Sequence, residues 1–217
     1  MRSLTMNRLL AISLCVLLLT GCSRTVTTMP SLGTQMTVNA TFRGNIDLTK
    51  NRYLMIISTA EAFNIPILPP EGTSLDEFLE PGDSPVIGNI ADYYTKYYST
   101  WNSYVVLDSL GYSFAKGPFS AASPASRESF ASITSISNQI SFVLRLDKIF
   151  ASIPDTIYFD IISVDYPTGA QKYLKDHIAP PTQSISKISG SLLSKSDEVK
   201  SDIDPSLDII SWSVKIE

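Results

Sequence analysis

Apolar residues in this chain alternate with polar ones over short segments, and no segment sustains the 3.6-residue period of an amphipathic helix. The pattern is clearest at the C-terminus, where Ile210, Trp212, Val214 and Ile216 are separated by single residues, two of them serines. Successive side chains of a strand point to opposite faces, so each such segment is predicted to be a strand with one buried face. Comparable segments lie at 36–42, 140–146 and 157–161.

Shorter apolar segments complete the set of predicted strands. Residues 53–57 (YLMII) form a short continuous apolar run, which predicts a strand buried on both faces. Seven to nine strands with frequent turn residues predict an all-β fold, a single antiparallel β-sandwich of the immunoglobulin-like or jelly-roll-like kind with long proline-rich loops. The remaining predicted strands lie at 103–107, 112–114, 130–136 and 185–192.

A long proline-rich segment interrupts this strand pattern. Five of the 13 prolines fall between Phe63 and Asn89. Ser74 and Glu77 have the spacing of a capping box, which predicts one helical turn at 74–79. Loops of this length are uncommon in compact domains and often carry function.

The N-terminus has the features of an export signal. An apolar run occupies residues 9–19, Arg2 and Arg8 precede it, and no acidic residue occurs before Asp47. Eleven helical residues span about 16 Å, which is well short of a hydrocarbon core about 30 Å thick. A permanent single span is therefore not expected, whereas a removable signal is.

Leu19, Thr20, Gly21 and Cys22 follow this run, and they resemble the lipobox of bacterial lipoproteins. The resemblance implies cleavage before Cys22, a diacylglycerol on its sulfur and acylation of the new amino terminus. Several acyl chains anchor a protein stably in a membrane, whereas one chain does so only marginally. Ser23, in place of an aspartate after the cysteine, resembles the pattern that permits transfer of lipoproteins to the outer membrane. The protein is therefore expected at the outer membrane, on its periplasmic or surface face. The chain is thus predicted to contain a signal peptide at 1–21, an acylated cysteine and tether at 22–35, and a β-sandwich domain at 36–217.

Charge and cysteine content limit the possible partners. Residues 1–21 include two of the 17 basic residues and none of the 21 acidic ones, so the remaining chain has a net charge of −6. An acidic surface argues against nucleic acid and against electrostatic adhesion to anionic lipid, so membrane binding is expected to depend on the lipid. Cys15 lies in the predicted signal, so only Cys22 remains and neither a disulfide nor a thiol nucleophile is expected.

An aromatic cluster is the strongest candidate binding site in the sequence: Tyr93, Tyr94, Tyr97, Tyr98 and Trp101. Exposed tyrosine and tryptophan rings can stack on sugars or anchor a protein partner. The same spacing also fits one face of a short helix or a strand, in which case the rings would pack in the core.

Other candidate sites carry weaker signals. Asp202, Asp204 and Asp208 could supply oxygen ligands to calcium, although the segment lacks the glycine and the final glutamate of an EF-hand loop. His177 is the only histidine and is interpreted as an exposed residue without a chemical role. No residue is identified as catalytic, and no cofactor is expected beyond the lipid on Cys22.

Two functions follow as hypotheses. The order of strands and proline-rich loops is similar to exported β-sandwich modules of the carbohydrate-binding or DOMON type, in architecture only. The favoured hypothesis is a non-enzymatic, lipid-anchored envelope protein that binds a glycan or an envelope protein. The alternative is a hydrolase that acts on envelope polysaccharide through paired carboxylates in the region 63–101.

Overall fold

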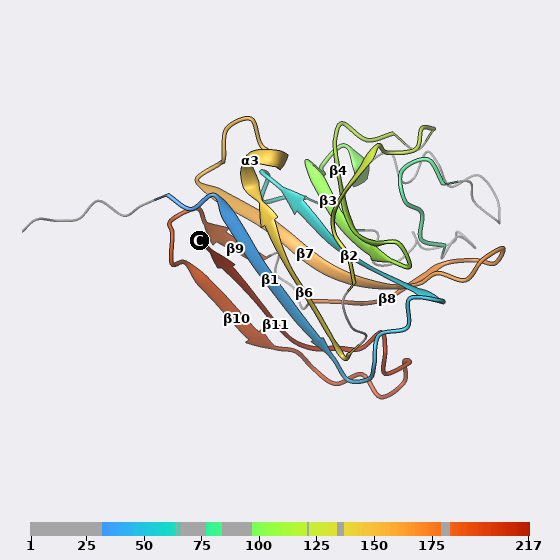
Figure 1. The fold of residues 1–217 in the computed structure, drawn as a ribbon. Helices are drawn as coiled ribbons and strands as arrows, with labels where there is room; N and C mark the ends of the chain where they lie inside the picture. The colour runs from blue at the N-terminus through green and yellow to red at the C-terminus, as the bar shows by residue number, and fades with distance from the viewer. Residues whose placement is uncertain are drawn as a thin grey trace, which may run out of the picture. The chain divides into compact units, whose positions relative to one another are not determined.

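The computed structural model describes residues 32–63, 65, 77–83, 97–120, 122–133, 137–178 and 183–217. These residues belong to one compact unit, 31–217, and contain eleven strands and one short helix. The strands form two antiparallel sheets, as Figure 1 shows. The all-β sandwich predicted from the alternating pattern is thus confirmed, with more strands than the seven to nine expected.

The four-stranded sheet contains both ends of the folded unit. Its central strand β1 pairs with the C-terminal strand β11 on one side and with β6 on the other. Val38 of β1 lies opposite Val214 and Phe142, so one face of the sheet is apolar and buried. The strands follow the order β10 (Leu192–Ser196), β11 (Ile209–Ile216), β1 (Gln35–Phe42) and β6 (Gln139–Arg145).

The seven-stranded sheet packs against this apolar face. Its central strand β2 is almost entirely buried, as the run at 53–57 predicted. The order is β5 (Arg127–Ala131), β4 (Gly111–Lys116), β3 (Ser103–Asp108), β2 (Asn51–Ser58), β7 (Thr156–Asp165) and β8 (Tyr173–His177), and β9 (Gln183–Ser186) pairs with the first half of β7.

Two hydrophobic cores explain why β2 is buried on both faces. The first core lies between the sheets and includes Phe42, Phe159 and Trp212. The second core covers the outer face of the seven-stranded sheet and includes Phe78, Tyr98, Trp101 and Tyr104. The seven-stranded sheet therefore has an apolar layer on each side.

Several predicted boundaries differ from the structure. The predicted strand at 185–192 is two strands, β9 and β10, because the chain turns between them at Gly190, which has a φ of 89°. The predicted strand at 130–136 corresponds to β5, which ends at Ala131. Residues 77–80 are not helical, and Ser74 lies outside the described residues. Strand β8 and the helix α3 (Leu146–Ile149) were not predicted.

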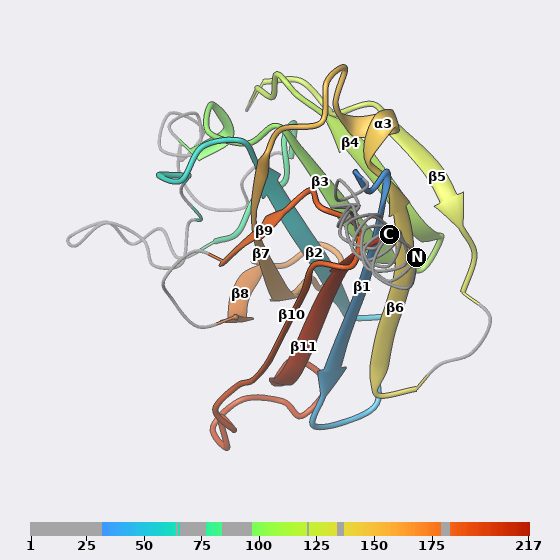
Figure 2. The same cartoon turned by 90° about the vertical axis from the view of Figure 1, so that its left-hand side faces the viewer.

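The two ends of the sandwich differ in what they contain, and Figure 2 shows them at the top and bottom of the four-stranded sheet. The α3 end comprises residues 32–34, α3, the turn at 187–191 and Glu217. The sequence analysis assigned residues 32–35 to the tether, but hydrogen bonds hold them at this end of the sandwich. The Thr34 amide donates to the Glu217 carbonyl at 2.8 Å. The Arg43 end comprises residues 43–47 and the loop 197–208, where the Gly44 amide donates to the Pro205 carbonyl at 2.7 Å.

Candidate functional site

A hollow of about 720 Å³ opens at the α3 end of the sandwich. This volume lies within the range of small-molecule and cofactor sites. Trp101, Ile149 and Phe150 are buried side chains on its wall, and exposed polar residues surround them. Those exposed polar residues are Ser99, Asn102, Lys116, Asp147 and Lys148.

Backbone hydrogen bonds hold the segments that line the hollow. The Gly117 amide donates to the Asn102 carbonyl at 2.8 Å, and the Asn102 amide donates to the Ile57 carbonyl at 3.0 Å. A Cβ atom at Gly117 would lie 3.1 Å from the Trp101 carbonyl oxygen, so glycine allows this close approach. On the other side, the Leu146 amide at the start of α3 donates to the Thr34 carbonyl at 2.8 Å.

The charges around the hollow are not balanced. Arg145 donates two hydrogen bonds to Asp147, at 3.0 and 2.5 Å, and these lower the pKa of the Asp147 carboxyl. Lys116 and Lys148 form no ion pair with any acidic residue in the described part of the chain. Two ammonium groups therefore remain to bind an acidic or hydroxyl-rich ligand. Neither lysine carried a local sequence signal, since Lys116 ends β4 of one sheet and Lys148 lies in α3, which follows β6 of the other sheet.

The aromatic cluster is divided by the structure. Tyr98 and Trp101 are 1% and 4% exposed, their rings pack edge to face at 5.2 Å, and the Tyr98 hydroxyl donates to the Leu79 carbonyl at 2.9 Å. Tyr97 is partly buried against the same second core, and Tyr93 and Tyr94 lie outside the described residues. Tyr98 and Trp101 are therefore core residues that border the hollow, and the prediction of exposed stacking rings is wrong for these two.

The three aspartates of the calcium candidate do not converge. Asp208 is fully buried and its carboxylate binds Arg43 Nε at 2.5 Å, while Asp204 accepts hydrogen bonds from the amide and hydroxyl of Ser206 at 2.8 and 2.7 Å. Asp202 is exposed. Within the described ranges, no three His, Cys, Asp or Glu side chains are arranged to hold a metal ion.

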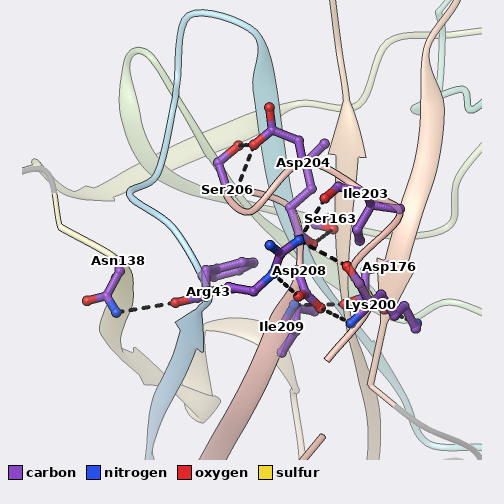
Figure 3. A network of polar contacts seen from close by, with 12 residues as sticks. Arg43, Asn138, Ser163, Asp176, Lys200, Ile203, Asp204, Ser206, Asp208 and Ile209 are labelled. Carbon is purple, nitrogen blue, oxygen red and sulfur yellow. Dashed lines mark hydrogen bonds and ion pairs between the residues drawn. The ribbon is translucent and has the colours of Figure 1, made fainter. Parts of the chain in front are cut away.

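Asp204 and Asp208 instead belong to a polar network that closes the Arg43 end, shown in Figure 3. The Arg43 guanidinium also donates to the carbonyls of Lys200 and Ile203, at 3.0 and 2.7 Å. The Lys200 ammonium in turn pairs with buried Asp176, whose pKa is raised by burial. The network joins three segments distant in sequence, and its charges are satisfied internally.

His177 is not an exposed bystander as predicted. Its Nδ1 lies 3.4 Å from Asp160 Oδ2, and both side chains are largely buried on the outer face of β7 and β8. Burial raises the pKa of Asp160 to about 6, and the neighbouring carboxylate raises the pKa of His177. Asp160 Oδ1 has no hydrogen-bond partner. Among the described residues, no hydroxyl group is hydrogen-bonded to His177 as a nucleophile would be, so the pair does not form a nucleophile–base arrangement.

Cations neutralise carboxylates in the region proposed for hydrolysis. Glu80 is 2% exposed and binds both Arg52, at 2.5 Å, and Arg127. Asp83 accepts a hydrogen bond from the Tyr166 hydroxyl and forms an ion pair with Lys172 at 3.2 Å. The sequence carried no signal for this cluster, because its members come from separate strands and loops.

Comparison with known proteins adds no assignment to this geometry. No protein family matches the chain, and neither the curated proteins nor the solved structures contain a match to it. No helix among the described residues has the length and apolar character needed to cross a bilayer.

Proposed function

We propose that the chain is an exported lipoprotein, acylated at Cys22, whose β-sandwich binds a glycan or an envelope protein without catalysing a reaction. The observation that supports binding is the hollow of about 720 Å³ at the α3 end, with Lys116 and Lys148 at its rim. The lipobox resemblance at residues 19–22 supports the anchor.

The chemistry of the hollow favours an acidic ligand. Ammonium groups bind carboxylate and phosphate oxygens as point charges, and both lysines lack an ion-pair partner among the described residues. Ile149 and Phe150, which are 9% and 8% exposed, make the wall of the hollow apolar beside the lysines, and such a wall suits the less polar face of a sugar ring. A glycan that carries uronate or phosphate groups fits both features.

Binding is favoured over hydrolysis because of how the carboxylates are used. A glycosidase needs one carboxyl group that gives a proton and a second that acts as base or nucleophile. Two of the carboxylates described between residues 63 and 101, Glu80 and Asp83, are already occupied by cations and a tyrosine hydroxyl. The hollow contains a single carboxylate, Asp147, which Arg145 occupies.

Calorimetry on the purified full-length lipoprotein tests the class of ligand. Polygalacturonate is the acidic polymer, and dextran is the neutral control. We expect binding to polygalacturonate alone, weakened at least about tenfold in a Lys116→Ala/Lys148→Ala variant. Lys50→Ala is the matched control, because Lys50 is an exposed lysine at the Arg43 end. Equal affinity in the double variant and the parent protein would contradict the assignment of the hollow.

The anchor has a separate test. Mass spectrometry of the purified protein is expected to show a chain that begins at acylated Cys22, and Cys22→Ser is expected to move the protein from the membrane to the soluble fraction. Membrane association that survives the substitution would contradict the lipoprotein assignment.

A further inference from the structure

We propose that the α3 end of the domain rests on the lipid bilayer through an exposed apolar patch formed by Leu32, Ile188 and Leu192, here named the Leu192 patch. The proposal rests on the acylation of Cys22 put forward above, and it adds a second contact with the membrane. It also gives the domain a defined orientation.

The three residues of the patch lie on neighbouring stretches of backbone. Leu32 and Ile188 face each other in a single antiparallel bridge, and the Ser191 amide donates to the Ile188 carbonyl at 3.0 Å in the turn that leads to Leu192. Their exposed fractions are 61%, 40% and 63%. They make up half of the six large apolar side chains that are exposed in the described part of the chain. Grouped exposed apolar side chains indicate a contact surface more strongly than isolated ones do.

The charges beside the patch are paired. Lys187 binds Asp155 at 2.7 Å, and Lys215, which lies opposite Leu192 in the sheet, binds Glu217 at 2.6 Å. Asp197, Glu198 and Asp202 lie in the loop at the Arg43 end of the same sheet. The net charge of −6 argued against electrostatic adhesion to anionic lipid, and the structure places this loop's acidic groups away from the patch.

The position of Cys22 identifies the bilayer as the occupant. Only nine residues separate Cys22 from Leu32, so Leu32 lies at most about 36 Å from the acylated residue even if the connection is fully extended. Leu32 is itself part of the patch, whereas β1 carries the chain about 25 Å further to reach the Arg43 end. Of the two ends of the domain, the one with the apolar patch is therefore the end held near the lipid.

Fluorescence on the acylated, full-length protein in phosphatidylcholine vesicles tests this contact. An environment-sensitive label on Leu192→Cys is expected to be quenched at least about threefold more strongly by a lipid-borne quencher than the same label on Leu110→Cys. Leu110 is a matched control, because it is 89% exposed in the turn between β3 and β4, away from the α3 end. Equal quenching at the two positions would overturn the proposal.

Two further arms separate this proposal from the proposed function and from a protein partner. If the protein does not float with vesicles and carries no acyl chain, the anchor is wrong; if it floats but the Leu192 label stays exposed to water, only the Leu192 patch is wrong. The unacylated Cys22→Ser protein without vesicles tests for a second copy of the chain. If the label is shielded there in a way that depends on protein concentration, the patch binds a second copy and the proposal is overturned.

A Leu32→Ser/Ile188→Ser/Leu192→Ser variant is expected to float yet become several-fold more sensitive to protease at the 187–191 turn.

Discussion

The two ends of the sandwich use the same kinds of side chains in opposite ways. At the Arg43 end, the carboxylates of the ion pairs are buried: Asp208 and Asp176 have almost no exposed surface and bind the partly exposed Arg43 and Lys200. At the α3 end, the pairs lie at the surface, as in Arg145 with Asp147, and two lysines remain unpaired around a hollow. Buried pairs constrain structure, whereas exposed charges stay available to ligands, so one end is organised for stability and the other for contact.

Loss of a buried partner at the Arg43 end should have the largest effect. Asp208→Ala is expected to lower the free energy of unfolding by about 3–5 kcal/mol, because it leaves the Arg43 guanidinium without its carboxylate in a partly buried site. Urea denaturation measures the change. A loss no greater than that of an exposed aspartate would show that the Arg43 network does not stabilise the loop 197–208.

The aromatic residues beside the hollow should behave as core. Trp101→Ala is expected to cost about 3 kcal/mol, at the low end for a buried tryptophan, because the neighbouring hollow lets the site relax. Thermal and urea unfolding measure the cost, and partly buried Tyr97→Ala is the milder comparison. If Trp101→Ala weakened ligand binding without changing stability, the ring would be part of the binding surface.

Between the two ends, Asp160 and His177 should make stability depend on pH. Both groups have a pKa raised in the folded protein, Asp160 from 3.8 to about 6 by burial and His177 above 6.5 by its carboxylate neighbour. The folded state therefore holds protons that the unfolded state releases. The Asp160 contribution is complete below about pH 4 and is lost as the pH rises through 6, whereas the His177 contribution is complete below about pH 6.5 and is lost above it. The free energy of unfolding is expected to fall by about 2 kcal/mol between about pH 4 and 7.

Urea unfolding at a series of pH values measures this slope, and Asp160→Asn should flatten it. Buried Asp176, whose pKa is also raised, adds a slope of the same sign that the variant should retain. Lys200, which acts on His177 through its charge, is unchanged in the variant. Identical slopes in the variant and the parent protein would exclude the Asp160–His177 pair as the source.

The smallest effect is expected at the exposed pair of the α3 end. Asp147→Ala should leave the denaturation midpoint unchanged, since both Asp147 and Arg145 are well exposed to solvent. The same substitution should tighten binding of polygalacturonate, because it removes the one carboxylate that lines the hollow. A clear loss of stability would erase the contrast between the two ends.

The strands were predictable because their signal is local. The alternation through Met36, Val38, Ala40 and Phe42 reflects which side chains face the core, and the structure buries all four. Strand β8 escaped prediction because its sequence, YLKDH, has mixed polarity on both faces. The turn at Gly190 was also missed, since β9 and β10 are distinguished by their partners, β7 in one sheet and β11 in the other, which are distant in sequence from β9 or not signalled locally.

The candidate sites were less predictable because they are made by distant segments. Arg43 meets Asp208 across 165 positions of sequence, and nothing local to either residue indicates the partner. Lys116 and Lys148 come together only when the two sheets pack. The aromatic cluster was ambiguous for a different reason, since the spacing of Tyr98 and Trp101 fits a buried face as well as an exposed one.

The pairing of β1 with β11 also sets when the domain can fold. Met36 lies opposite Ile216 in the register of the two strands, so β1 completes its pairing only through a contact between residues 180 positions apart. Its other neighbour, β6, begins only at Gln139. Contacts of such sequence separation form slowly, and until β11 pairs with β1, one edge of β1 lacks its hydrogen-bonding partner. The open edge of β1 can instead pair with a strand of another chain, so slow closure of this sheet gives misassembly between chains time to occur.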